Sequence, residues 1–138
     1  MAKDADRPRE SHGFMRAEKV IPEDVGTAHE AGVRSFVVRA DLIDWTAFAV
    51  WLSLLVHRHG RKILRVKGLL NVPGSAGPIW LNAVQHFVHP PVHLEGWPDE
   101  DRSSRIVFIV QDLPESAIRA SLDAMLLRAD RELVRETA

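Results

Sequence analysis

The stretch DWTAFAVWLSLLVHRHGRKILRVKGLL, Asp44–Leu70, contains two different hydrophobic periods in succession. In its first half, apolar residues recur every three or four positions, which is the spacing of one face of an α-helix. These residues are Trp45, Phe48, Ala49, Leu52, Leu55 and Val56. The Asp44 carboxylate is placed to accept the free amide hydrogens of the first turn, and Gly60 is expected to end the helix in a left-handed conformation. This pattern predicts a helix over residues 45–59.

The second half, Lys62–Leu70, predicts a strand in which successive side chains alternate between the two faces of a sheet. Four residues share one face on this alternation: Ile63, Arg65, Lys67 and Leu69. Further strands are predicted at residues 35–40, 79–88 and 105–111, with a short extended piece at 92–94. The apolar composition of the 105–111 strand indicates a central place in the sheet.

A second helix is predicted to begin at Pro114, since proline suits the first position of a helix. Its expected buried stripe consists of Ile118, Leu122, Met125, Leu126, Ala129 and Leu133. Short turns between the strands favour a largely antiparallel sheet of four to five strands, and two amphipathic helices need one apolar face to pack on. We therefore predict an α+β two-layer sandwich. Its boundaries are 32–130 for the domain, 1–31 for a flexible tail or linker, and 131–138 for the helix end and C-terminal tail.

Composition narrows the classes of function. The chain has 138 residues, a formal net charge of −1 and no cysteine, which excludes disulfides, thiolate metal sites and cysteine nucleophiles. Such a balanced charge does not favour nucleic acid or an anionic membrane as a partner. The longest apolar stretch, Trp45–Val56, is shorter than the roughly 20 residues that cross a bilayer. Met1–Glu10 lacks the apolar centre of a signal peptide, so we expect a cytoplasmic protein.

Four blocks of the sequence carry a resemblance to a known family. They are Gly60–Asn71 (GRKILRVKGLLN), Val84–His86 (VQH), Trp97–Asp99 (WPD) and Arg102–Ile109 (RSSRIVFI). In this order and spacing they resemble the CobW C-terminal domain, which follows the GTPase domain in CobW-like metal-delivery GTPases. The resemblance covers roughly residues 28–127 and implies the accessory half of a metallochaperone-like GTPase.

The chain also departs from the family pattern. A phosphate loop requires G-x-x-x-x-G-K-[ST], whose backbone amides hold the phosphates, and the sequence contains none; the family's cysteine-rich metal motif is also missing. The resemblance therefore implies a non-catalytic accessory domain, linked to cobalamin synthesis or to cobalt and zinc handling. Its expected partner is a CobW-type GTPase domain or a metalloprotein client. GTP would act only through a separate GTPase domain, and no intrinsic cofactor is expected.

Five residues are predicted to bind a partner. Arg65 and Lys67 lie side by side on one strand face, in the densest block of resemblance; the alternative is that their heads pair with carboxylates on neighbouring strands. The other three are Trp80, Trp97 and Arg102. For Trp97 the alternative is packing of a loop against the sheet, and for Arg102 it is an ion pair with a nearby acid.

Histidines suggest a different function. His86, His89 and His93 lie close in sequence, and imidazoles are ligands for zinc and cobalt. The alternative function is therefore a stand-alone, histidine-based transition-metal-binding protein that binds zinc or cobalt weakly. Spacing favours ordinary surface histidines instead, since His86 and His89 would point to opposite sides of one strand. Pro90 and Pro91 also separate His89 from His93.

Overall fold

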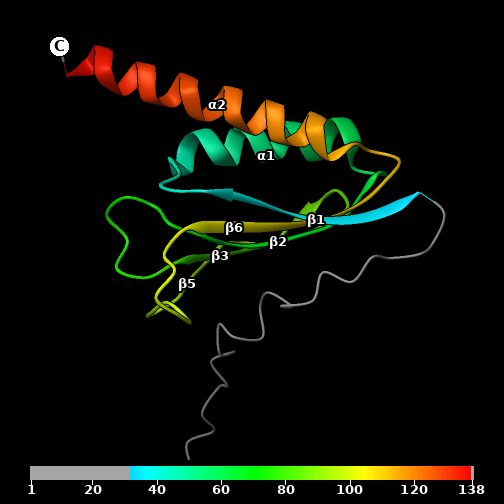
Figure 1. The fold of residues 1–138 in the computed structure, drawn as a ribbon, viewed down its shortest axis with the longest axis horizontal. Coiled ribbons are helices and arrows are strands. Elements are labelled where there is room, and N and C mark those ends of the chain that lie inside the picture. The colour runs from blue at the N-terminus through cyan, green and yellow to red at the C-terminus, as the bar shows by residue number, and fades with distance from the viewer. Residues whose placement is uncertain (1–31, 138) are drawn as a thin grey trace, which may run out of the picture.

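The structure is a computed structural model that describes residues 32–137, so the predicted tail at 1–31 lies outside the described residues. In chain order the elements are β1 (Val33–Ala40), α1 (Trp45–His59), β2 (Ile63–Leu70), β3 (Ile79–Val84), β4 (Phe87–Val88), β5 (Val92–His93), β6 (Ser104–Gln111) and α2 (Glu115–Glu136). Both helices lie on the same side of one sheet (Figure 1). The predicted two-layer α+β sandwich is confirmed. No helix in the described part of the chain is long and apolar enough to cross a membrane.

The sheet has the strand order β1-β6-β2-β3-β4, with β5 paired to the other part of β3, and every pair of strands is antiparallel. β6 therefore lies between the first two long strands, as its apolar sequence predicted. Phe108 of β6 is fully buried and stacks on Phe36 of β1, with ring centroids 5.5 Å apart. The edge of Trp51 from α1 meets the same Phe108 ring at 6.4 Å. These aromatic contacts join the sheet to the helical layer.

Strict alternation fails at the start of β2. The pairing of β2 with β6 shifts register between Ile63 and Arg65, which is a β-bulge. Ile63 is consequently buried in the core beside the helices, as is Val66, whereas Arg65 is exposed. The prediction that Ile63 shares a face with Arg65 was therefore wrong, because the bulge inserts one residue into the alternation.

The predicted strand at residues 79–88 is two strands. The chain reverses at Gln85 and His86, so that Val84 pairs with Phe87 across a tight hairpin. Gln85 has a φ of 50°, in the left-handed region that favours glycine or asparagine. The turn thus lacks the usual sequence signal of a hairpin. This split, together with the short β5, raises the sheet to six strands from the predicted four to five.

Gly60 follows α1 for a reason other than the predicted left-handed conformation. Its φ is −56°, which is right-handed and open to any residue. An added Cβ atom would overlap the His86 imidazole and the carbonyl oxygen of Val56. A side chain at this position would need both the His86 ring and the Val56 carbonyl to shift, so glycine suits the point where the β3–β4 hairpin meets the end of the helix. The N-terminal cap agrees with prediction, since the Asp44 carboxylate accepts a hydrogen bond of 2.8 Å from the Ala47 amide.

α2 is longer than the core that it covers. Pro114 is the capping residue and the helix starts one position later than predicted. Ile118 and Leu122 are buried, and the apolar residues that follow them, Met125 and Leu126, are partly buried. Leu133 is 54% exposed, so its predicted place in the buried stripe was wrong. The sheet and α1 end before this part of the helix, and Figure 1 shows α2 projecting beyond them.

An aspartate of the loop between β5 and β6 holds this loop against the sheet. Asp101 accepts hydrogen bonds from the Ser103 hydroxyl at 2.6 Å and amide at 2.9 Å, and pairs with Arg39 of β1 at 2.9 Å. The Ser103 bonds and the Arg39 guanidinium hold the pKa of the Asp101 carboxyl well below its usual range. The ionised carboxylate therefore ties the loop to the sheet.

Replacing the central aromatic residue tests the fold. Phe108→Ala is expected to lower the free energy of unfolding by about 3–5 kcal/mol, because it removes a buried ring and leaves a cavity. Denaturant unfolding followed by circular dichroism measures the loss. Phe87→Ala, which removes a ring that is 75% exposed, is the control and should cost below about 0.5 kcal/mol. A loss below about 1 kcal/mol for Phe108→Ala would contradict its central position.

Acid titration tests the Asp101 tie. A carboxyl whose pKa is lower in the folded state stabilises the fold above its unfolded pKa, and this stabilisation disappears as the pH falls through the folded pKa. Asp101→Asn removes this contribution, so its unfolding free energy should fall less steeply than that of the native chain between about pH 5 and pH 2. Glu100→Gln changes a neighbouring acid that makes no ion pair within residues 32–137, and should retain the native slope. Equal slopes for the Asp101→Asn and native chains would show that the Asp101 carboxylate does not stabilise the fold.

Candidate functional site

The sheet has one face that neither helix covers, which we call the open face. Val66 is buried between the sheet and the helices, so its neighbours Arg65 and Lys67 are directed to the open face. Lys67 lies opposite Val107 of β6 on one side and opposite Asn82 of β3 on the other. The two predicted cations therefore lie on an inner strand, near the middle of this face, with strands on both sides.

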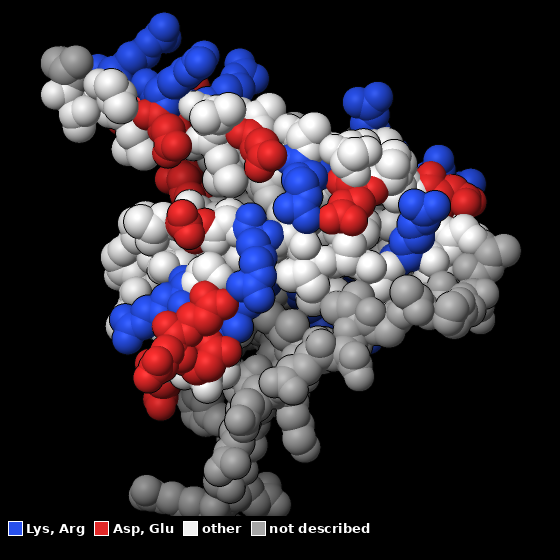
Figure 2. Space-filling view, in the orientation of Figure 1, with Lys and Arg blue, Asp and Glu red and all other residues white. Residues whose placement is uncertain are grey.

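One end of the open face is electrically neutralised. Arg39 of β1 lies opposite Arg105 of β6, and both meet acids of the β5–β6 loop. Asp101 pairs with Arg39 at 2.9 Å, and Asp99 pairs with Arg105 at 2.9 Å. Arg105 also approaches the Asp101 carboxylate at 3.8 Å. The acidic run is thus used within the fold, and Figure 2 shows acidic side chains clustered beside basic ones at the lower left.

The centre of the open face is not neutralised. Within residues 32–137, no carboxylate lies within ion-pair distance of Arg65 or Lys67. Partial burial, and secondly the like charge of Arg65, lower the pKa of the Lys67 ammonium from its ordinary value. The alternative in which these cations pair with carboxylates of neighbouring strands is therefore not what the described structure contains. Two cations therefore remain side by side without a carboxylate partner in the described structure: Arg65, which is exposed, and Lys67, which is partly buried.

Three buried polar atoms on the same face also lack hydrogen-bond partners in the described structure. They are Trp80 Nε1, Asn82 Oδ1 and Arg105 Nε. Asn82 lies opposite Lys67, and Trp80 lies opposite Leu69, two pairs further along the same two strands. Buried polar groups in folded proteins nearly always have a partner, because leaving one unpaired costs about 1–3 kcal/mol. Two unused donors and an unused acceptor therefore lie opposite Lys67 and the next residue of β2 on the same face, Leu69.

An apolar border completes the face on the β3 side. Val84 and Phe87 pair across the hairpin and are 39% and 75% exposed, and Val92 pairs with Trp80 and is 42% exposed. Phe87 was missed by sequence reasoning, which placed it in one continuous strand on the opposite side from Val84. Only the turn at Gln85 brings the two together. An arginine and exposed apolar side chains, including the aromatic Phe87, thus share one face, and arginine and aromatic residues are enriched in protein–protein interfaces.

The other predicted partner residues lie apart from this centre. Trp97 and Arg102 belong to the loop between β5 and β6; Trp97 is half-buried and Arg102 is exposed. The Arg102 carbonyl accepts a hydrogen bond of 2.9 Å from the Asn71 side chain. Of the five residues, the structure therefore places Arg65, Lys67 and Trp80 on two adjacent strands of the open face, with Trp97 and Arg102 in a separate loop.

The three candidate metal ligands are not brought together. His86 lies in the hairpin turn against Gly60, His89 follows β4, and His93 in β5 pairs with Ile79 on the helix side of the sheet. Within residues 32–137, no three His, Cys, Asp or Glu side chains are grouped to hold one metal ion. A histidine metal site stays a prediction without support from the geometry.

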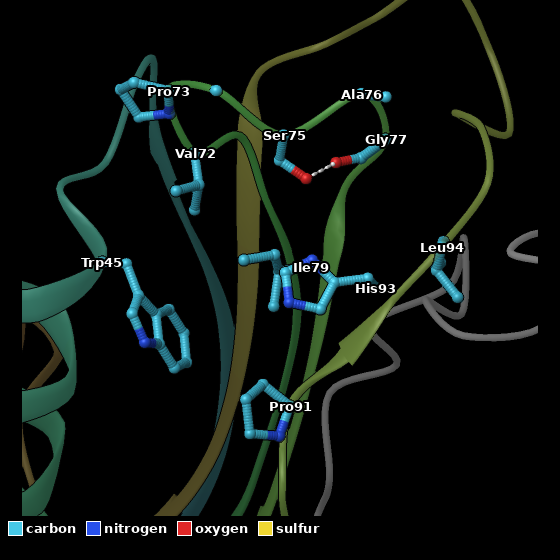
Figure 3. A pocket seen from close by; sticks show the side chains of 11 residues that line it. Trp45, Val72, Pro73, Ser75, Ala76, Gly77, Ile79, Pro91, His93 and Leu94 are labelled. Carbon is cyan, nitrogen blue, oxygen red and sulfur yellow. Dashed lines mark hydrogen bonds between the residues drawn. The ribbon is translucent and has the colours of Figure 1, made fainter.

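A pocket of about 470 Å³ lies beside His93, under the loop between β2 and β3. Figure 3 shows the Trp45 indole on one side, with Pro91 and the His93 imidazole facing it. The Ser75 hydroxyl donates a hydrogen bond of 2.8 Å to the Gly77 carbonyl and shapes the loop above. Among residues 32–137, His93 is the sole titratable side chain in this lining, so these residues place no acid–base pair and no metal ligand set there.

Comparison with known proteins identifies the family of the chain. The family model described as the cobalamin synthesis protein cobW C-terminal domain matches residues 33–126. The match begins with β1 and ends at Leu126, where α2 leaves the core. No protein with a curated description matches the chain.

Two solved structures are similar to the chain. One is the Zn(II)-bound YjiA GTPase from E. coli, with 29% sequence identity and a TM-score of 0.61. The other is a triple mutant of YjiA GTPase, also Zn(II)-bound, with the same identity and TM-score. Each similarity covers 68% of this chain and 30% of the YjiA chain. By its match over residues 33–126, the chain belongs to the family of cobW C-terminal domains.

Proposed function

We propose that this chain is a non-catalytic accessory domain of a CobW-like, metal-handling GTPase, and that it binds the GTPase domain through the open face. Family membership supports the general class. The similar region makes up 30% of a protein described as a GTPase, and the sequence of this chain contains no phosphate loop. Nucleotide chemistry is accordingly assigned to a separate GTPase domain. Zinc or cobalt is the proposed metal, since the similar YjiA GTPase was described with Zn(II).

The observation that carries the proposed docking face is the unneutralised pair Arg65 and Lys67. In the described structure these charges have no carboxylate partner, and the lowered pKa of Lys67 means that its charge is unfavourable there. A partner carboxylate would remove this cost and would form a desolvated, charge-assisted hydrogen bond. The same partner could cover the exposed Phe87 ring. Charge and burial both favour an acidic partner surface with apolar residues around it.

Substitution of both cations tests this face. Arg65→Gln with Lys67→Gln should leave the melting temperature nearly unchanged, because surface charges without partners contribute less than about 1 kcal/mol to stability. Binding to a CobW-type GTPase domain should weaken by about 2–5 kcal/mol for each desolvated pair lost. The effect should be larger at low salt than at high salt. Calorimetric titration at two salt concentrations measures it.

The matched control is Arg61→Gln with Lys62→Gln, which removes one arginine and one lysine from the exposed turn between α1 and β2. This variant carries the same change in net charge and should bind the GTPase domain like the native chain. A large fall in melting temperature for the Arg65 and Lys67 variant, with binding intact, would make those cations structural. Equal weakening by both variants would indicate only a nonspecific charge effect.

Nucleotide binding provides an independent test of the non-catalytic role. The chain, offered GTP and magnesium, should neither bind nor hydrolyse the nucleotide, because it has no loop whose amides hold phosphates. Isothermal calorimetry and phosphate release are the measurements. A dissociation constant in the micromolar range would contradict the assignment.

A further inference from the structure

The last turns of α2 expose apolar side chains that the domain itself does not cover. Leu127, Leu133 and Val134 are 60%, 54% and 68% exposed. The ten residues 127–136 extend about 15 Å of helix, and isolated helices of this length are marginal in water. We call this part the α2 extension. Its apolar side chains would be covered by a packing partner that the described chain does not supply.

A groove lies along the base of the extension. It has a volume of about 740 Å³ and is bounded by α1 on one side and α2 on the other. The two helices diverge toward the C-terminal end of α2 (Figure 1). On α1 the groove is lined by Val50 and Leu54, which are 56% and 64% exposed and one turn apart. On α2 it is lined by Met125, Ala129 and Leu133, also one turn apart.

A hydrogen bond between the two helices forms the bottom of the groove. The Trp51 indole nitrogen donates a hydrogen bond of 2.9 Å to the Ser121 hydroxyl, which joins α1 to α2 at the bottom. The apolar side chains of the lining stand beside four charged ones, which are Asp44, Arg128, Glu132 and Glu136. Two parallel apolar stripes with helical spacing fit an amphipathic helix lying between them.

The charges of the extension identify its occupant. Three arginines (128, 131 and 135) and three acids (130, 132 and 136) lie in residues 127–136, so the net charge of this segment is 3 − 3 = 0. Both signs are visible along the helical layer in Figure 2. Arg128 lines the same groove as Glu132 and Glu136. A segment with this pattern is complementary to an antiparallel copy of itself, since Arg128 of one copy can meet Glu132 or Glu136 of the other.

We propose that the groove binds the α2 extension of a second copy of this chain, so that two copies pair about a twofold axis through their helices. The contact is isologous, because each copy contributes a groove and a helix. It would cover Leu54 and Leu133 of both copies and form a four-helix arrangement of two α1 and two α2 helices. This surface lies on the helix side of the sheet, opposite the open face, so the two interactions do not compete.

Analytical ultracentrifugation of the full chain tests the proposal. The native chain should change from monomer to dimer as its concentration rises through the micromolar range. Leu54→Asp and Leu133→Asp each place a charge in the apolar centre and should weaken the dimer at least about tenfold. Both residues are exposed in the single copy, so the fold should be retained, which circular dichroism checks. Phe87→Asp, at the most exposed apolar residue of the open face, is the control and should dimerise like the native chain.

Cross-linking supplies a second readout. The chain has no cysteine, so a single introduced thiol can be linked only to the same position in another copy. Ala129→Cys, in the groove, should form a covalent dimer with a short bis-maleimide at low micromolar concentration. Gln85→Cys, in the exposed hairpin turn on the other side of the molecule, should not. A native chain that stays monomeric at every concentration would overturn the proposal. So would a dimer that Leu54→Asp and Leu133→Asp leave unchanged, or equal cross-linking at both positions. A dimer lost on these substitutions, with GTPase binding through the open face unaffected, separates this contact from the proposed function.

Discussion

The rest of the domain depends on the contacts that the buried Phe108 ring makes with two other aromatic rings. Phe108 belongs to β6, stacks on Phe36 of β1 and receives the edge of Trp51 from α1. Three segments that are far apart in the chain meet at this residue, and α2 then closes the layer with Ile118 and Leu122. Since both helices have one apolar stripe each, they must share the single sheet face that this cluster occupies. Burial on one side leaves the other face of the sheet without a second layer among the described residues.

The polar chemistry of the open face follows from that one-sided burial. The open face carries the basic and polar side chains of Arg65, Lys67 and Asn82 beside the buried Leu69 and Val107. At one end, the acids of the β5–β6 loop neutralise Arg39 and Arg105. At the centre, Arg65 and Lys67 stay without a carboxylate partner in the described structure, beside buried polar atoms that are also unpartnered. The difference between this neutralised end and the centre is the physical basis of the proposed docking face. The proposed pairing of copies uses the opposite side, where α2 extends past the core.

Secondary structure was largely predictable because local signals and burial agree. α1 was predicted with its observed bounds, since an Asp44 cap precedes a regular apolar stripe. The long strands β1, β2 and β6 were predicted within two residues of their observed ends. The blocks of sequence resemblance pointed to the family that the later comparison shows. The presence of Arg65 and Lys67 on one strand face was also readable from a period of two, because both residues follow the bulge.

The features that only the tertiary structure decided are those that depend on contacts between segments distant in the sequence. The sequence determined the two-layer architecture, α1 and the central strand, because each depends on a repeating local pattern. It carried no signal for the turn at Gln85, the bulge after Ile63 or the packing of His86 on Gly60, because these depend on contacts between segments. Leu133 continues a helical stripe yet is exposed, because the layer beneath it ends first. Likewise, whether an acid neutralises Arg65, Lys67 or Arg105 depends on which strand faces the β5–β6 loop. Charge pairing is therefore a property of the assembled sheet.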